Sequence, residues 1–208
     1  MKKYGENKIF VEGKSDKTFI DFLLLHFFQI EDKSIVVDVE GKDKLKNSPL
    51  LVNERRRSEN SKNLIIFDTD SIEKKGGREE RLKELQEIKT LLDIEFSIFL
   101  LPSDDENEGM LEDLINKCFK EEFNFFDDCW SSMIECIKVS EMENLNIPAQ
   151  HGFLYSKIDL FSKHKVKDIE EEKNKISYHS LDIWNFDRDK NKELDKLLKF
   201  IEDNLFNN

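Results

Sequence analysis

The sequence contains little cysteine, and the cysteines it has are not arranged to bind a metal or to staple a fold. Cys118, Cys129 and Cys136 are the three in 208 residues, and no two of them form a CxxC pair. An odd set without that spacing predicts a reducing environment and argues against a cysteine-based zinc site. A chain of this length can bury a real core without disulfides, as one compact domain or one domain with an extension.

Long apolar runs and targeting segments are also missing. The longest apolar stretch lies around residues 19–28, where Asp21 and His26 interrupt it. That stretch is too short to span a bilayer. The polar N-terminus enters a strand-like segment at once, which does not fit a signal peptide. We therefore expect a soluble, cytoplasmic protein without membrane contact.

Several common catalytic motifs are absent from the sequence. There is no GxxxxGK[ST] loop, so we expect no ATPase activity of its own, and no serine occupies a GxSxG elbow. The four histidines, at positions 26, 151, 164 and 179, are scattered along the chain. That scatter argues against a histidine-based hydrolase.

The net charge of −12 argues against tight unaided binding to nucleic acid, because phosphate-binding proteins usually present a basic face. Local basic groups do occur, and they are Lys2, Lys3, Arg55 to Arg57, Lys163, Lys165 and Lys167. A carboxylate cluster adds to the negative total, yet it becomes a phosphate-binding site once divalent cations fill it. The charge is therefore compatible with a site that works through a metal ion.

Apolar strand-like runs alternate with helix-like segments over the first half of the chain. The predicted strands are 8–11, 34–39, 63–67 and 96–101, and the predicted helices are one after Ser15, a weaker one at 42–57 and one at 78–92. Ser15 is expected to cap the first helix. This order predicts an α/β, Rossmann-like fold with a mostly parallel sheet flanked by helices. Its site should lie at the carboxyl ends of the strands.

The second half of the chain differs from the first in composition and in predicted secondary structure. A helix is predicted at 111–119, and the chain from Phe123 onward looks helical and rich in aromatic residues. Turns are expected near Pro148 and Gly152, and a last helix at about 192–205. We expect a catalytic domain at 1–119 and a mainly helical region at 120–208 packed on it.

Two acidic motifs fall at predicted strand ends. Val11 leads into Glu12-Gly13, and Asp16 follows on the first turn of the helix. The third strand runs into Asp68-Thr69-Asp70. Carboxylates that converge in this way suit hard cations such as Mg²⁺ or Mn²⁺. Each motif alone is also compatible with an acidic surface turn, and Asp16 alone with a favourable helix N-terminus.

Taken in order, the segments VEGKSD and IIFDTD resemble the two motifs of the TOPRIM domain, over roughly residues 8–119. The resemblance implies that Glu12 acts at the chemical step or holds a metal, and that Asp68 and Asp70 bind a divalent ion. Asp16 could join that metal. Because the chain lacks room for the tyrosine-bearing domains of a topoisomerase, and no cysteine or histidine spacing supports a zinc module, the resemblance favours a small nuclease.

The segments LLP at 100–102 and EGMLEDL at 108–114, with WNF at 184–186, resemble stand-alone relatives of the OLD (overcoming lysogenization defect) nucleases. That resemblance implies that Glu112 supplies a second metal position, unless it only favours a helix N-terminus. It also implies a lysine that stabilises the transferring phosphate, for which Lys157 is a candidate, with Lys14 as another. Either lysine is equally compatible with a surface position.

These features predict metal-dependent hydrolysis of DNA or RNA, with a role in defence against phage or mobile elements. One alternative is a non-catalytic subunit that binds a separate ATPase or a toxin. Another is a ribosomal-RNA maturation ribonuclease, although the DxD of that group leads to glycine sooner than Gly76. A homo-oligomer is also possible.

Overall fold

The fold is described from a computed structural model. It describes residues 4–53, 61–74, 76–103, 105–140, 142, 144–161, 178 and 182–206. Two compact units are present, of which the first comprises Met1–Leu114 with Arg188–Asn208 and the second comprises Ile115–Asp187. The predicted boundary at residue 119 stays a prediction, while the last helix groups here with the first unit.

A parallel four-stranded sheet forms the centre of the first unit. Its strands are β1 (Lys8–Val11), β2 (Val36–Asp38), β3 (Asn63–Asp68) and β4 (Ser97–Leu101). Their order is β2-β1-β3-β4, and every neighbouring pair is parallel. The two central strands are apolar on both faces because helices cover both sides. The predicted α/β class with a parallel sheet flanked by helices is confirmed.

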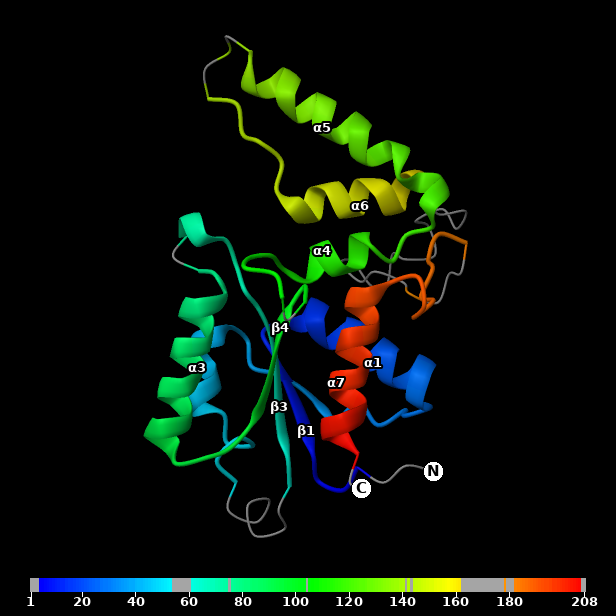
Figure 1. The fold of residues 1–208 in the computed structure, drawn as a ribbon. Helices are drawn as coiled ribbons and strands as arrows, with labels where there is room; N and C mark the ends of the chain where they lie inside the picture. The colour runs from blue at the N-terminus through cyan, green and yellow to red at the C-terminus, as the bar shows by residue number, and fades with distance from the viewer. Residues whose placement is uncertain are drawn as a thin grey trace. The chain divides into compact units, whose positions relative to one another are not determined.

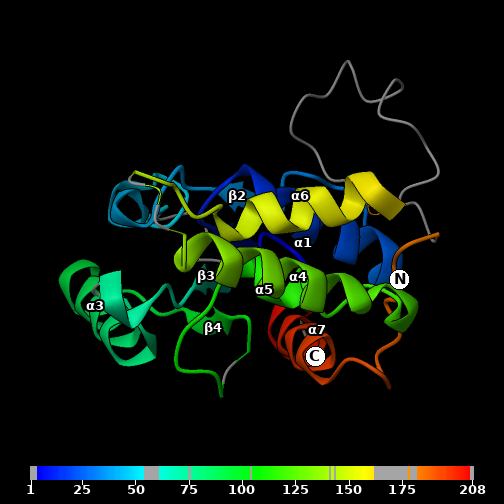
Figure 2. The same cartoon turned by 90° about the horizontal axis from the view of Figure 1, so that it is seen from above.

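Helices cover both faces of the sheet. α1 (Lys14–Phe28) and α7 (Lys192–Leu205) lie on one face and α3 (Arg78–Leu92) on the other, as Figures 1 and 2 show. On the α3 face, Phe67, Leu85 and Leu100 belong to one buried core, together with Leu45 of the short 3-10 helix η1 (Lys42–Asn47). The layers therefore leave the carboxyl edge of the sheet for loops.

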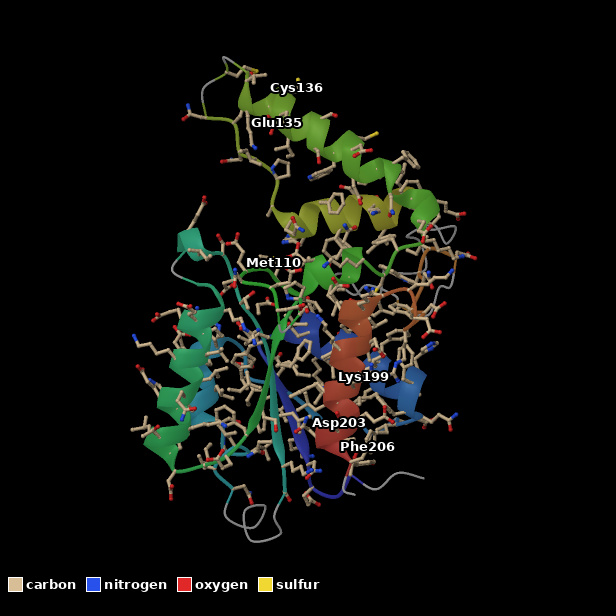
Figure 3. All side chains as sticks on the ribbon, in the orientation of Figure 1. Met110, Glu135, Cys136, Lys199, Asp203 and Phe206 are labelled. Carbon is tan, nitrogen blue, oxygen red and sulfur yellow. The ribbon has the colours of Figure 1, made fainter. Side chains whose placement is uncertain are left out.

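The helix α7 is strongly amphipathic and completes the first unit. Five of its side chains are fully buried, namely Leu194, Leu197, Leu198, Ile201 and Leu205. Asn191 caps it by accepting a hydrogen bond from the Leu194 amide at 2.9 Å. Phe206, labelled in Figure 3, is buried just after the helix. At the same end Asn7 Nδ2 donates to the Leu205 carbonyl at 2.6 Å.

The second unit contains the end of α4 (Leu111–Asn116), a 3-10 turn η3 (Glu121–Phe123), α5 (Phe125–Lys138) and α6 (Gln150–Phe161). Rings of α5 and α6 contact one another, since Phe126 lies 5.7 Å from Phe153 and Trp130 lies 5.4 Å from Phe153 between ring centroids. Side chains of α5 such as Glu135 and Cys136 are exposed (Figure 3). In the described part of this unit, the predicted helical character is present.

Three local predictions need correction. The first helix begins at Lys14 with the extended Gly13 as its N-cap and no side-chain cap bond, so the predicted capping by Ser15 is wrong. The expected helix at 42–57 is only the 3-10 helix η1 in its described part, and residues 54–57 lie outside the described residues. Gly152 lies inside α6 and not at a turn.

In the described residues no helix has the length and apolar character to cross a membrane.

The remaining described element is a 3-10 turn, η2 (Ile72–Lys74), which follows the acidic segment after β3. The loop from Asp68 to Gly77 is closed by backbone hydrogen bonds. The Gly77 amide donates to the Thr69 carbonyl at 2.7 Å, and the Arg78 amide donates to the Asn107 carbonyl at 2.8 Å. These bonds join the start of α3 to the loop at the carboxyl edge, where the predicted site residues lie.

Candidate metal centre

Glu12 and Asp68 meet where the connectivity of the sheet reverses. From β1 the chain passes through α1 to β2 on one side, and from β3 it passes through α3 to β4 on the other. The reversal therefore falls between the neighbouring strands β1 and β3. Open parallel sheets bind ligands at the carboxyl ends of the strands at such a point. Glu12 follows β1 directly and Asp68 is the last residue of β3.

Backbone amides orient both carboxylates. Glu12 Oε1 accepts a hydrogen bond from the Asp68 amide at 3.2 Å. Asp68 Oδ1 accepts one from the amide of Leu111, the first residue of α4, at 2.8 Å. These bonds join three segments that are distant in the sequence, and they hold the two acidic groups close together.

Asp16 adds a third carboxylate, from the first turn of α1. Its side chain is buried, with 8% of the residue exposed, and its Oδ1 has no hydrogen-bond partner among the described residues. A buried acceptor without a donor carries an uncompensated desolvation cost. A Cβ placed at Gly13 would lie 3.4 Å from Asp16 Oδ2, so the backbone there passes close to this carboxylate. The unsatisfied oxygen is a feature that a bound cation would remedy.

Burial and mutual repulsion disfavour the charged form of all three groups. Burial raises the pKa of Glu12 to about 7, with Asp70 and Asp16 adding to the increase and Arg81 opposing it. Burial raises the pKa of Asp16 to about 6, and the negative charges of Glu112 and Asp38 act in the same direction. For Asp68, burial and then Asp16, Glu12 and Glu112 raise the pKa well above its usual value. Burial is thus the main reason why these groups resist ionisation, and repulsion between neighbouring carboxylates adds to it.

Asp70 has different partners. Its backbone is left-handed, with φ of 59°, and it forms an antiparallel bridge with Gly109. Its Oδ2 accepts hydrogen bonds from Arg81 Nη2 at 2.5 Å and from Lys42 Nζ at 3.4 Å. The structure brings Glu12, Asp16 and Asp68 together, and it pairs Asp70 with two cations. Metal binding by Asp70 stays a prediction.

Glu112 lies close enough to act electrostatically on Asp16 and Asp68, from the first turn of α4. Its predicted role in a second metal position stays a prediction. Lys14 is exposed at the start of α1, with no described ion pair to the acidic cluster. Its predicted action on phosphate also remains untested.

Lys157 is fully buried within the second unit. Its ammonium donates to Asp127 Oδ1 at 2.6 Å and to Asn116 Oδ1 at 2.9 Å. It also lies over the rings of Phe119 and Phe153, 4.6 Å and 5.5 Å from their centroids. These contacts satisfy the buried cation. Its predicted contact with a transferring phosphate stays a prediction.

Sequence reasoning missed Arg81, which is 2% exposed and donates to the Asp68 carbonyl, to Glu84 and to Asp70. Residues 68–70 form the acidic turn. Sequence reasoning also missed Thr69, which is fully buried with its hydroxyl 2.8 Å from the carbonyl oxygens of both Leu101 and Gly109. A signal for Arg81 was present. It lies four residues before Leu85, on the buried stripe of α3, where a charged residue must find partners.

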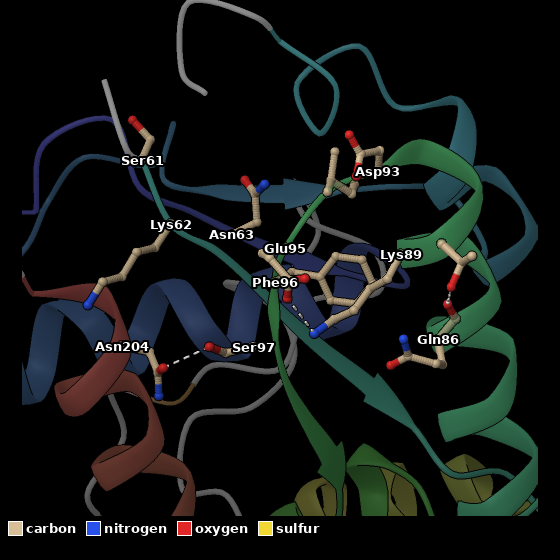
Figure 4. A pocket seen from close by; sticks show the side chains of 12 residues that line it. Ser61, Lys62, Asn63, Gln86, Lys89, Asp93, Glu95, Phe96, Ser97 and Asn204 are labelled. Atoms are coloured by element: carbon tan, nitrogen blue, oxygen red, sulfur yellow. Dashed lines mark hydrogen bonds and ion pairs between the residues drawn. The ribbon is translucent and has the colours of Figure 1, made fainter. Parts of the chain in front are cut away.

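Of two pockets on the first unit, one lies away from the carboxylate cluster and the other lies beside Asp70. One of about 720 Å³ is at the amino ends of β3 and β4, lined in part by Lys62, Lys89 and Asn204 (Figure 4). It lies at the edge opposite the carboxylates. The other, of about 740 Å³, lies between η1 and α3 and is lined by Lys42 and Arg81, both of which contact Asp70. The second hollow therefore adjoins the acidic turn.

Within the described ranges, no group of three or more His, Cys, Asp or Glu side chains is arranged so that it could hold a metal ion. The donor set nevertheless suits a hard divalent cation, because it consists of carboxylate oxygens, one of them unsatisfied, whose charged forms are disfavoured by burial and mutual repulsion. Glu12, Asp16 and Asp68 are the residues that would hold such an ion, with Glu112 nearby.

Comparison with known proteins gives one match. A family model described as "Protein of unknown function (DUF3226)" matches residues 6–203. The chain belongs to the DUF3226 family. No curated protein and no solved structure matches this chain. Because the match spans both compact units, the carboxylate cluster and Lys157 both fall within the DUF3226 region.

Proposed function

We propose that this DUF3226 protein is a divalent-metal-dependent nuclease that hydrolyses phosphodiester bonds of DNA or RNA. The observation that carries the proposal is the gathering of Glu12, Asp16 and Asp68 at the switch point of the sheet, with a buried oxygen left unsatisfied. The resemblance of the two acidic segments to TOPRIM motifs supports the same function. A role in defence against phage or mobile elements is part of this proposal.

Each residue of the cluster has a defined part in the proposal. Glu12, Asp16 and Asp68 would provide the oxygens that hold the ion, and the amides of Asp68 and Leu111 orient the carboxylates of Glu12 and Asp68. When bound, Mg²⁺ or Mn²⁺ would lower the pKa of a coordinated water and offset charge on the phosphate. Glu112 acts on the same charge balance from α4. A cation also reduces the repulsion between this acidic protein and its substrate.

The hollow beside Asp70 supports binding of a polyanion at this edge. Four basic side chains line it, and they are Lys42, Lys46, Arg81 and Lys83. Three acidic side chains, those of Asp43, Glu84 and Glu87, line it as well. Lys42 is partly exposed and lies next to the acidic turn, so it can contact a phosphate held at the cluster.

The direct test is cleavage of matched DNA and RNA substrates in Mn²⁺, Mg²⁺ or EDTA. We expect cutting in Mn²⁺ or Mg²⁺ and none in EDTA. Glu12→Gln and Asp68→Asn should abolish cutting while thermal unfolding stays cooperative. Glu40→Gln is the matched control, because Glu40 follows β2 at the same edge but is exposed and paired with Lys44. Wild-type rates in Glu12→Gln, or no cutting of either substrate under any condition, would refute the proposal.

A second candidate function is that of a non-catalytic subunit that binds metal or a partner such as a separate ATPase. The observation that favours it is the pairing of Asp70 with Arg81 and Lys42, which leaves fewer free carboxylates for two-metal chemistry. The two candidates give different results with purified protein. Tight Mn²⁺ binding in calorimetry without cleavage of any substrate favours the subunit.

A further inference from the structure

The guanidinium of Arg81 lies inside the loop that carries the acidic turn. Arg81 belongs to the first turn of α3, and 2% of it is exposed. Its Nε donates to the main-chain carbonyl of Asp68 at 3.0 Å, its Nη2 to Asp70 Oδ2 at 2.5 Å, and its Nη1 to Glu84 Oε2 at 2.5 Å. One planar group therefore holds the backbone at Asp68 and the side chain at Asp70 together.

We propose that Arg81 is the positioning residue of the metal centre, whose three-way fork fixes the turn at residues 68–70. It acts through its neighbours, because its Nε, Nη1 and Nη2 donate to Asp68, Glu84 and Asp70. The metal-binding part of this inference rests on the proposed function, whereas the positioning of the turn can be measured without metal.

The geometry explains why arginine occupies this position. A guanidinium presents donors in three directions of one plane, whereas an ammonium is a single point and cannot span the same partners. Burying the cation is costly, and Asp70 and Glu84 offset the cost as partly exposed carboxylates. Because Asp68 Oδ1 also accepts the Leu111 amide, fixing the Asp68 backbone fixes the direction of a carboxylate of the cluster.

Other bonds also hold the turn, among them those from the buried Thr69 hydroxyl to the Leu101 and Gly109 carbonyls, and Arg81 adds the shortest contact of the Asp70 side chain. Asp70 has φ of 59°, a conformation that is costly for a residue other than glycine. Its amide donates to Gly109 at 3.0 Å, and this bridge is not part of any strand. Without Arg81, the Asp70 carboxylate would lose its shortest contact, and the left-handed turn would have less to stabilise it.

Hydrogen exchange on the metal-free protein tests the positioning directly. In Arg81→Gln we expect the amides of Asp70 and Leu111 to exchange about tenfold faster or more, relative to the amide of Ile66 in β3, because charge-assisted bonds are lost locally. Arg81→Lys, which keeps the charge, should behave like Arg81→Gln. Glu84→Gln is the matched control, because it alters the third contact only, and it should leave both amides as in wild type.

Mn²⁺ affinity, measured by calorimetry, tests the consequence. We expect binding to weaken by about 10-fold to 100-fold in Arg81→Gln and Arg81→Lys, as for other residues that orient metal ligands, and to stay unchanged in Glu84→Gln. If wild type binds no Mn²⁺ while the exchange pattern follows expectation, the proposed function fails and the positioning role stands.

Three results would overturn the inference itself. The first is wild-type behaviour of Arg81→Lys, which would show that charge alone matters. The second is equal acceleration of the Ile66 amide, which would show a global loss of stability. The third is unchanged exchange at Asp70 in Arg81→Gln. Should Arg81→Gln fail to fold, Asp70→Asn weakens the same contact from its exposed end, and unchanged exchange of Leu111 and residue 70 would then refute the proposal.

Discussion

At the scale of single residues, two positively charged side chains of this protein, those of Lys157 and Arg81, are buried. Lys157 is the clearest case in the second unit, because its ammonium is fully buried between Asp127, Asn116 and two aromatic rings. In the first unit, Arg81 is buried as well, and it contacts more than one acidic side chain. It donates to the carboxylates of Asp70 and Glu84 and to the Asp68 carbonyl. Both cations lie on apolar helix faces, so their partners determine whether the helix can be buried.

For Lys157, we predict a structural effect of substitution. Lys157→Ala should lower the free energy of unfolding by about 2 kcal/mol, because it removes the buried ion pair and opens a cavity, while Asp127 remains partly hydrated. Urea denaturation measures this. Lys138→Ala is the matched control, since Lys138 is half exposed on α5 and its loss should change stability little. Lost cleavage with unchanged stability would instead support the phosphate role that the OLD resemblance implies.

The three raised carboxylate pKa values predict how stability depends on pH. With pKa values of about 7 for Glu12 and about 6 for Asp16, the folded protein keeps protons that the unfolded chain has already released. The free energy of unfolding of the metal-free protein should therefore fall as the pH rises from about 4 to about 7. Thermal melts in EDTA across this range should show it, and Glu12→Gln should flatten the decline. A melting temperature that rises over this range would contradict the assignment.

At the scale of elements, replacing two glycines by alanine should have opposite effects, because Gly109 has no room for a Cβ and Gly152 has room. Gly109 forms the bridge to Asp70 with φ of 140°, and a Cβ there would lie 2.6 Å from Pro102 Cδ. Gly109→Ala should therefore destabilise the fold and weaken Mn²⁺ binding, as calorimetry and thermal melts would show. Gly152 lies within α6 with room for a Cβ, whose nearest atom would be Pro148 Cβ at 3.9 Å.

Gly152→Ala is the companion substitution, and its expected effect has the opposite sign. Alanine in a helix should raise the free energy of unfolding by about 0.5–1 kcal/mol. The same melts would detect both changes. If Gly109→Ala were tolerated as well as Gly152→Ala, the bridge to Asp70 would not constrain the turn as described.

The sequence was sufficient to predict the elements that bury continuous apolar runs. β1 and α3 have the predicted bounds, and β3 extends one residue beyond its prediction. The strands could be predicted because burial on both faces demands apolar runs such as NLIIF. The sequence could not predict that the first helix starts at Lys14 without a serine cap, which depends on the extended backbone of Gly13. It located Glu12, Asp16 and Asp68, but not the cations around Asp70, because pairing with Arg81 and Lys42 is decided by packing.

At the scale of the whole chain, the first unit is assembled from segments on both sides of the second. Arg188–Asn208 belongs with Met1–Leu114, and α7 buries five aliphatic side chains there. We predict that a chain truncated before Arg188 loses cooperative unfolding, because the part of the sheet face that α7 covers, at β3 and β4, is left exposed. Circular dichroism melts would show this. Cooperative melting of the truncated chain, with metal binding intact, would show that α7 is dispensable.

The position of α7 in the chain also has a consequence for synthesis. All four strands leave the ribosome well before the helix that covers one of their faces. Until α7 emerges, β3 and β4 of the nascent sheet expose the apolar surface that α7 later covers. The first unit can therefore complete its fold only after α7 has been synthesised and has docked on β3 and β4.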